Sequence, residues 1–203
     1  MKFREYLKEI RPGESVMIEH TSLSKHPLLF HAIGETHGWN RMLIVDIIDS
    51  VLPILRWLRL SEFHVPENVA RIKAGGVSRW GRIILEVDPH KDPGIFLSKF
   101  NRKLREHYSK NPETVTVILN PERLVPIQDG DRHFIQSMAN LAAAFIGNPK
   151  RTTFYFVNRE MAEKTYLGLL EEAFTRVLVV GDDGKVLIAK SPHHDEEGNE
   201  LEI

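Results

Sequence analysis

Short apolar runs rich in β-branched residues alternate along the chain with longer runs in which apolar residues recur every three or four positions. The short runs predict buried strands, and the longer runs predict amphipathic helices. The predicted strands are residues 15–19, 41–48, 82–87, 114–119, 152–157, 176–180 and 185–189. The predicted helices are residues 3–10, 27–36, 50–60, 92–108, 131–146 and 160–174.

Capping residues support two of these helices. Asp92 is a predicted N-cap, and Pro93 follows it at the first helical position. The helix over residues 131–146 has an apolar stripe that ends at Phe145, and Gly147 and Pro149 are predicted to stop it.

The alternation of strands and helices predicts βαβ units and therefore a mainly parallel sheet with helices on both faces. We expect a three-layer α/β/α fold of about seven strands. The segment Gly181-Asp182-Asp183-Gly184 predicts a turn, so the last two strands form a C-terminal antiparallel β-hairpin.

Two segments do not follow this alternation. Residues 65–81, which contain Gly75-Gly76, are predicted to be irregular. Residues 192–203 are acidic and predicted to be a flexible tail, which leaves residues 1–191 as a single domain.

The composition narrows the possible functions. A net charge of -1 favours neither nucleic acid nor a membrane surface, and the absence of Cys excludes disulfides and thiolate chemistry. The charged N-terminus does not resemble a signal peptide, and no apolar stretch is long enough to span a bilayer. We expect a cytoplasmic protein.

The segment between the first strand and the next helix lies where a phosphate-binding P-loop would lie. A P-loop follows the pattern G-x-x-x-x-G-K-[ST]. This chain has Glu19 and Ser24 at the two glycine positions, Lys25 at the lysine position and His26 at the hydroxyl position. Of the four required residues, the lysine alone is present.

The order of elements is similar to that of RecA/KaiC-like ATPases. Those proteins also open with a short helix, a proline-glycine turn (here Pro12-Gly13), a first strand and a P-loop, and the C-terminal run RVLVVGDDGKVLIAKSP is similar to their closing hairpin. The chain also resembles a group of uncharacterised archaeal proteins from Pyrococcus and Thermococcus relatives. Membership implies a RecA-like fold with a degenerate P-loop and no established activity, and the fold relatives imply self-association.

The departures from the P-loop pattern argue against ATP hydrolysis. A carboxylate at Glu19 would repel a phosphate by several kcal/mol at about 4 Å. A neutral imidazole at His26 is a poor Mg²⁺ ligand, and Pro27 removes an N–H donor at the helix start. Asn120 stands at the strand end where a second Mg²⁺-binding carboxylate is expected.

Parallel strands end along one edge of a sheet, where ligands of such folds bind. The residues that end predicted strands there are Glu19, Asp46, Asp88, Asn120 and Asn158. Asp46 and Asp49 lie near the position of a carboxylate that would polarise an attacking water, but we interpret them as strand-end and helix-cap acids.

Other candidates have simpler structural interpretations. The ten histidines include no spacing typical of a metal site, although His31 and Glu35 are four residues apart. The segment 75–81 together with Arg79 and Arg82 suggests an anion-binding loop, but a loop between secondary-structure elements is favoured. The basic side chains of helix 92–110 suggest nucleic-acid contact, but a solvated helix face is favoured; they are Lys99, Arg102, Lys103, Arg105 and Lys110.

Our leading hypothesis is a RecA/KaiC-like domain without ATPase activity that acts as a binding, assembly or regulatory module. It has no predicted catalytic residues, metal ligands or cofactor, and its partner is an unknown protein or a second copy. A divergent nucleotide-binding protein or slow ATPase is the alternative, with ATP or ADP and Mg²⁺ as cofactor. Its site would use the degenerate P-loop positions Ser22, Ser24, Lys25 and His26. A second alternative is nucleic-acid binding through helix 92–110.

Overall fold

The computed structural model describes residues 1–144, 147–148 and 150–203. Its described strands form one nine-stranded sheet in the order β4-β3-β2-β5-β6-β1-β7-β8-β9. All neighbours pair in parallel from β4 to β7, and β8 and β9 continue the sheet in antiparallel pairs. The strands are β1 (Ser15–His20), β2 (Met42–Ile47), β3 (Ala70–Ala74), β4 (Arg82–Val87), β5 (Val115–Leu119), β6 (Thr152–Asn158), β7 (Arg176–Val180), β8 (Lys185–Lys190) and β9 (Glu200–Glu202).

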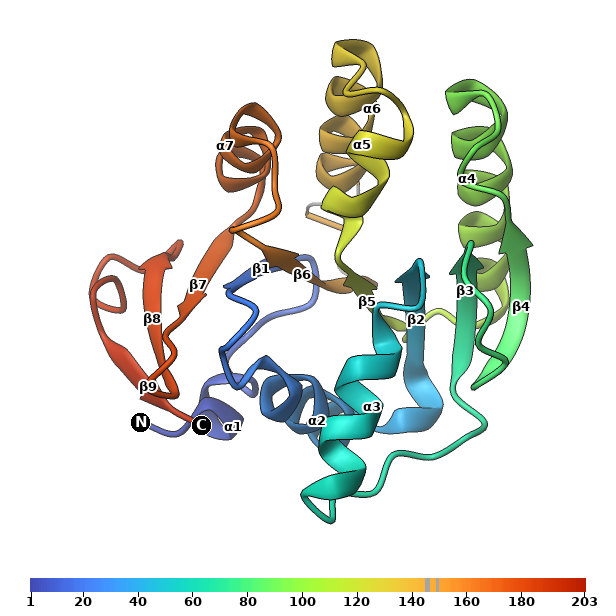
Figure 1. The fold of residues 1–203 in the computed structure, drawn as a ribbon. Coiled ribbons are helices and arrows are strands. Elements are labelled where there is room, and N and C mark those ends of the chain that lie inside the picture. The colour runs from blue at the N-terminus through green and yellow to red at the C-terminus, as the bar shows by residue number, and fades with distance from the viewer. Residues whose placement is uncertain (145–146, 149) are drawn as a thin grey trace.

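Helices cover both faces of this sheet. In Figure 1, α1, α2 and α3 lie on one side of the strands, and α4 to α7 lie on the other. The helices are α1 (Phe3–Tyr6), α2 (His26–His37), α3 (Val51–Leu60), α4 (Pro93–Lys110), α5 (Leu124–Ile127), α6 (Arg132–Ala143) and α7 (Lys164–Ala173), with short 3-10 turns at Trp39–Arg41 and Pro121–Arg123. The predicted three-layer α/β/α class with a C-terminal antiparallel hairpin is therefore confirmed.

The central strands are apolar on both sides because each face of the sheet carries its own core. Val16 and Ile18 of β1 pack with Phe30 of α2 in one cluster. Met17 of the same strand belongs to the opposite cluster, together with Tyr166 and Leu170 of α7. Successive side chains of a strand point to opposite faces, so a doubly covered strand is apolar throughout.

The segment 65–81 is not irregular throughout, because β3 lies within it. Arg71 and Lys73 make this strand look polar, yet their side chains are 0% and 1% exposed. Arg71 binds Asp46 and Asp49, and Lys73 binds Glu86 at 2.8 Å. Ion pairs formed with distant residues thus allow a strand that the hydrophobic pattern alone does not indicate.

The segment 192–203 also differs from its prediction as a flexible tail. Glu200–Glu202 form β9, which pairs with β8, and Leu201 is fully buried. Glu196 binds the buried guanidinium of Arg176. The acidic side chains of this segment therefore include partners of the core as well as exposed groups.

Several predicted helix ends shift by a few residues. The first helix ends at Tyr6, and the helix predicted from residue 160 begins at Lys164. Asp92 caps α4 as predicted, because its carboxylate accepts hydrogen bonds from the N–H groups of Gly94 and Ile95. Helix α6 is described to Ala143, and the predictions for Phe145, Ile146 and Pro149 lie outside the described residues. Within the described chain, the helices are too short or too polar to cross a bilayer.

Candidate functional site

The loop between β1 and α2 lies at the middle of the sheet's carboxyl edge. Strand β1 pairs with β6 on one side and β7 on the other, and His20 is in register with Asn158 of β6. Asn120 directly follows β5, the next strand along. The topology therefore brings the predicted strand-end residues Asn120 and Asn158 next to the loop between β1 and α2.

The backbone N–H groups of this loop are bound by oxygen atoms of the protein itself. The carboxylate of Glu160 accepts a hydrogen bond from the Ser22 N–H at 2.9 Å. The Thr21 hydroxyl oxygen accepts from the Leu23 and Ser24 N–H groups at 3.3 and 3.1 Å. In a P-loop, such N–H groups bind phosphate. Here an internal carboxylate and a hydroxyl take that role.

The predicted phosphate ligands Ser22 and Ser24 are also engaged. Asn158 donates its Nδ2–H to the Ser22 hydroxyl at 3.1 Å, and the Ser24 hydroxyl donates to the Thr21 carbonyl at 3.1 Å. The Thr21 hydroxyl in turn donates to Asp182 in the turn between β7 and β8. The loop is thus connected to both neighbouring strands by side-chain hydrogen bonds.

Lys25 precedes α2 and extends toward the same β7–β8 turn. A Cβ atom added to Gly184 would lie 3.3 Å from Lys25 Cδ and 3.4 Å from its Nζ. Gly184 has a φ of +88°, which also favours glycine at this position. Lys25 is therefore close to the loop but packs against the hairpin turn.

The rings of His20 and His26 stack at the start of α2, with centroids 3.9 Å apart and planes inclined by 25°. Burial lowers the pKa of His20 to about 4 and, together with the neighbouring His20, the pKa of His26 to about 3. Both rings are therefore neutral at pH 7. Neutral imidazoles do not attract phosphate as a cation would.

Glu122 is a buried carboxyl group that the sequence reasoning missed. It lies in the 3-10 turn after Asn120, is 1% exposed, and accepts hydrogen bonds from Asn120 Nδ2 at 2.8 Å and the Asn158 N–H at 3.2 Å. Its Oε2 has no hydrogen-bond partner among the described residues, and burial raises the pKa of Glu122 to about 7. The same Asn120 amide lies 3.1 Å from His20 Nε2. Asn120 therefore links the two buried groups.

Glu19 does not place its carboxyl group among the loop N–H groups, contrary to the prediction. Burial and the neighbouring Glu171 of α7 raise its pKa to about 7. Glu19 is two residues from Met17 along β1, so both side chains point to the face covered by α7. The carboxylate that occupies the loop comes instead from Glu160, which lies between β6 and α7.

Asp46 and Asp49 act as structural acids, as interpreted from the sequence. Asp46 accepts the Val51 N–H at the start of α3 at 2.9 Å and binds Arg71. Asp49 accepts the N–H groups of Val77 and Ser78 at 2.6 and 3.0 Å. The segment 75–81 does bind an anion, but that anion is the side chain of Asp49.

The remaining candidates are mostly paired within the protein. Glu106 binds Lys103 and Lys110 of α4, each at 3.2 Å, which reduces the positive charge of the predicted basic face. His31 Nε2 lies 3.2 Å from the His64 carbonyl oxygen and 4.0 Å from the Glu35 carboxylate. Within the described residues, no three His, Asp or Glu side chains form a group that could hold a metal ion.

We predict that Glu122→Gln changes how stability depends on pH. Glu122 has a pKa of about 7 in the fold, against an ordinary value of 4.5. Its contribution to stability is therefore complete below pH 4.5 and is lost as the pH rises through 7. Urea unfolding at pH 5 and pH 8 measures this effect. Between these two pH values, the free energy of unfolding of the variant should rise by about 2 to 3 kcal/mol relative to that of the wild type.

The exposed Glu67 provides the control for this measurement, because Glu67→Gln makes the same substitution at the surface and should change stability by less than about 0.5 kcal/mol. Burial lowers the pKa values of His20 and His26, so these two groups make the free energy of unfolding rise with pH below pH 6.5. For this reason the comparison uses the difference between the variant and the wild type at each pH. Parallel pH profiles for Glu122→Gln and the wild type would contradict the prediction.

Comparison with known proteins gives a family and a fold. The family model described as "Pyrococcus protein of unknown function, DUF257" matches residues 5–202. A solved structure of PH0250 from Pyrococcus horikoshii OT3 is 26% identical, has a TM-score of 0.81, and covers 100% of this chain and 98% of its own. A structure of the flagellar accessory protein FlaH from Methanocaldococcus jannaschii is 15% identical with a TM-score of 0.49, covering 94% and 86%. No curated protein matches the sequence.

Proposed function

Because the chain belongs to the DUF257 family of Pyrococcus proteins of unknown function, we propose a function from its own geometry. It is a RecA/KaiC-like α/β domain that does not hydrolyse ATP and acts as a binding, assembly or regulatory module. The observation that carries this proposal is the internal occupation of the loop N–H groups by Glu160 and Thr21.

ATP would have to displace these internal groups to bind at the loop. If Glu160 moves away, its hydrogen bond to the Ser22 N–H is lost. If Glu160 stays in place, its carboxylate lies beside the incoming phosphate. Two like charges about 4 Å apart repel by about 4 kcal/mol at an effective dielectric constant of 20. Either route weakens nucleotide binding.

The positions that would hold Mg²⁺ are equally unsuited. His26 is stacked on His20, and the Asn120 amide group already contacts both His20 and Glu122. Mg²⁺ prefers carboxylate, phosphate and water oxygens in an octahedral arrangement. Glu122 is the carboxyl group that Asn120 contacts, but its raised pKa favours the neutral form up to about pH 7.

Exposed apolar side chains support a role in binding another protein or a second copy. Leu60 at the end of α3 is 86% exposed, Trp57 one turn earlier is 39% exposed, and Phe63 just beyond the helix is 37% exposed. Residues three apart lie on the same side of a helix. Trp57 and Leu60 therefore lie on one side of α3, and exposed apolar groups that adjoin each other are typical of interaction surfaces.

We predict that millimolar ATP with Mg²⁺ does not stabilise the protein through the β1–α2 loop, so any change in the melting temperature should be the same in the wild type and in Lys25→Ala. A ligand at 100 times its Kd stabilises a fold by about 2.7 kcal/mol, which a thermal-shift measurement detects as several degrees. Lys25→Ala is the matched variant, because Lys25 is the one P-loop residue that this chain keeps. A rise in the wild type that Lys25→Ala abolishes would overturn the proposal and favour the divergent nucleotide-binding protein.

A further inference from the structure

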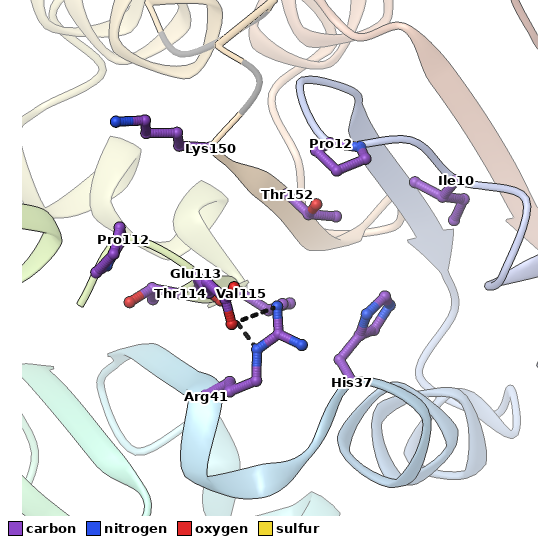
Figure 2. A pocket seen from close by; sticks show the side chains of 10 residues that line it. All are labelled: Ile10, Pro12, His37, Arg41, Pro112, Glu113, Thr114, Val115, Lys150 and Thr152. Atoms are coloured by element: carbon purple, nitrogen blue, oxygen red, sulfur yellow. Dashed lines mark hydrogen bonds and ion pairs between the residues drawn. The ribbon is translucent and has the colours of Figure 1, made fainter.

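Two adjoining hollows lie at the opposite, amino edge of the sheet. The larger has a volume of about 520 Å³ and lies between the end of α2 and the residues that precede β5 and β6 (Figure 2). The smaller, of about 340 Å³, lies toward the start of β4 and the end of α4. Arg41, Pro112, Glu113 and Thr114 line both hollows, so the two form one continuous groove.

The groove has more cationic than anionic side chains. Arg41 stands at the junction, where its Nε–H donates to the Glu113 carbonyl at 3.3 Å and its Nη2 lies 3.7 Å from the Glu113 carboxylate. Lys150 lines the larger hollow, and Arg82 and Lys110 line the smaller. Glu113 is the one carboxylate among the described lining residues.

Two of these cations, both exposed, are unpaired as far as the described residues go. The side chains of Arg82 and Lys150 have no hydrogen-bond or ion-pair partner among the described residues. A cation in the last turn of a helix is often explained by the helix dipole, and Lys110 of α4 fits that explanation. Arg82 does not, because it begins the strand β4.

The histidines of the groove are consistent with a positive local field. Burial and the nearby Arg41 lower the pKa of His37, whose buried Nε2 has no hydrogen-bond partner in the part of the chain that the structure describes. Burial together with Arg82, Lys103 and Arg151 lowers the pKa of His107. Both imidazoles thus lie beside cations that disfavour a further proton. An anion in the groove would offset these charges and raise both pKa values.

We propose that this groove binds a small organic anion that carries two or more phosphate groups. Arg41 would meet the ligand at the junction, Lys150 on one side and Arg82 on the other. Ile10, Pro12 and Val115 give the larger hollow an apolar wall for the body of the ligand. Hollows of about 300 to 1,000 Å³ are the size that holds small ligands. The site lies at the other edge of the sheet from the β1–α2 loop, so it is independent of the function proposed above.

Inorganic tripolyphosphate is the probe for this proposal. Calorimetric titration should detect binding, and NMR titration of the histidine ring protons should show the pKa values of His37 and His107 rising when the probe is added. The double variant Arg82→Gln/Lys150→Gln should bind about tenfold more weakly. Arg102→Gln, an exposed arginine of α4 that does not line the groove, should bind like the wild type.

Four results would overturn this proposal. The first is the absence of any shift at both histidines, and the second is equal affinity of the double variant and the wild type. The third is tighter binding of octathymidylate than of tripolyphosphate, which would assign the groove to a nucleic-acid backbone. Loss of binding in Lys25→Ala would place the probe at the β1–α2 loop instead.

Discussion

Replacing Arg71 by Met is expected to lower the free energy of unfolding by about 3 to 5 kcal/mol. Arg71 lies on β3 with a side chain that is 0% exposed, and its guanidinium binds Asp46, which is also 0% exposed, and Asp49 at 2.9 Å. Met removes the positive charge and leaves the Asp46 carboxylate buried without a counter-ion. An uncompensated buried charge costs more than the pair itself contributes.

Arg71 also holds the segment after β3 in place. Its Nη1 donates to the carbonyl oxygens of Ser78 and Trp80 at 3.2 and 2.8 Å. The Asp49 carboxylate accepts hydrogen bonds from N–H groups of the same segment. A Cβ atom on Gly76 would overlap this carboxylate. The variant should therefore loosen residues 76–80 as well as the sheet, and hydrogen exchange in this segment should become faster.

Equilibrium unfolding in urea measures the expected loss. Arg56→Met is the matched control, because Arg56 is exposed on α3 and should change stability by less than about 0.5 kcal/mol. Adding Asp46→Asn to Arg71→Met removes the unpaired charge and should recover part of the loss. A variant as stable as the control, or a double variant less stable than Arg71→Met alone, would contradict this explanation.

Arg176→Met should also cost about 3 to 5 kcal/mol, and its effect should reach both ends of the chain. Arg176 on β7 is fully buried and binds Glu14 at 2.8 Å and Glu196 of the C-terminal segment. It also donates to the Tyr6 hydroxyl of α1 at 2.7 Å. One guanidinium thus joins α1, β7 and the C-terminal segment.

Limited proteolysis tests this connection directly. A glutamate-specific protease should cut Arg176→Met near Glu196 faster than it cuts the wild type, and urea unfolding should report the loss of stability. Lys185→Met is the control, because Lys185 and Glu200 form a pair in which each side chain is 56% exposed. Such exposed pairs contribute about 1 kcal/mol or less. Unchanged cleavage near Glu196 would show that Arg176 does not hold this segment.

The sequence pattern predicted those elements whose stability comes from their own hydrophobic face. Helix α4 is the clearest case, since Phe96, Phe100 and Leu104 recur at helical spacing and Asp92 caps it. Strand β3 was missed because Arg71 and Lys73 occupy buried positions. Their partners, Asp46 and Glu86, are far enough away in sequence that no local pattern reveals the pairing.

The candidate site was also predicted in part from local sequence and in part decided by contacts between distant residues. The sequence placed Asn120, Asn158 and the loop between β1 and α2 at one edge of the sheet, because parallel strands end there. It predicted Glu19 as the carboxylate of the loop, and the structure has Glu160 in that role. Glu160 follows β6, 138 residues after Ser22, and only the pairing of β6 with β1 brings the two together.

The sequence by itself determined the α/β class, most of the strands and the absence of P-loop glycines, because these depend on residue type and short-range spacing. Tertiary structure alone decided which charges are buried, which carboxylate reaches the loop, that β9 completes the sheet, and that scattered cations line one groove at its amino edge. Each of those outcomes depends on contacts between segments distant in the chain, and the free energy of such contacts has no local signature in the sequence.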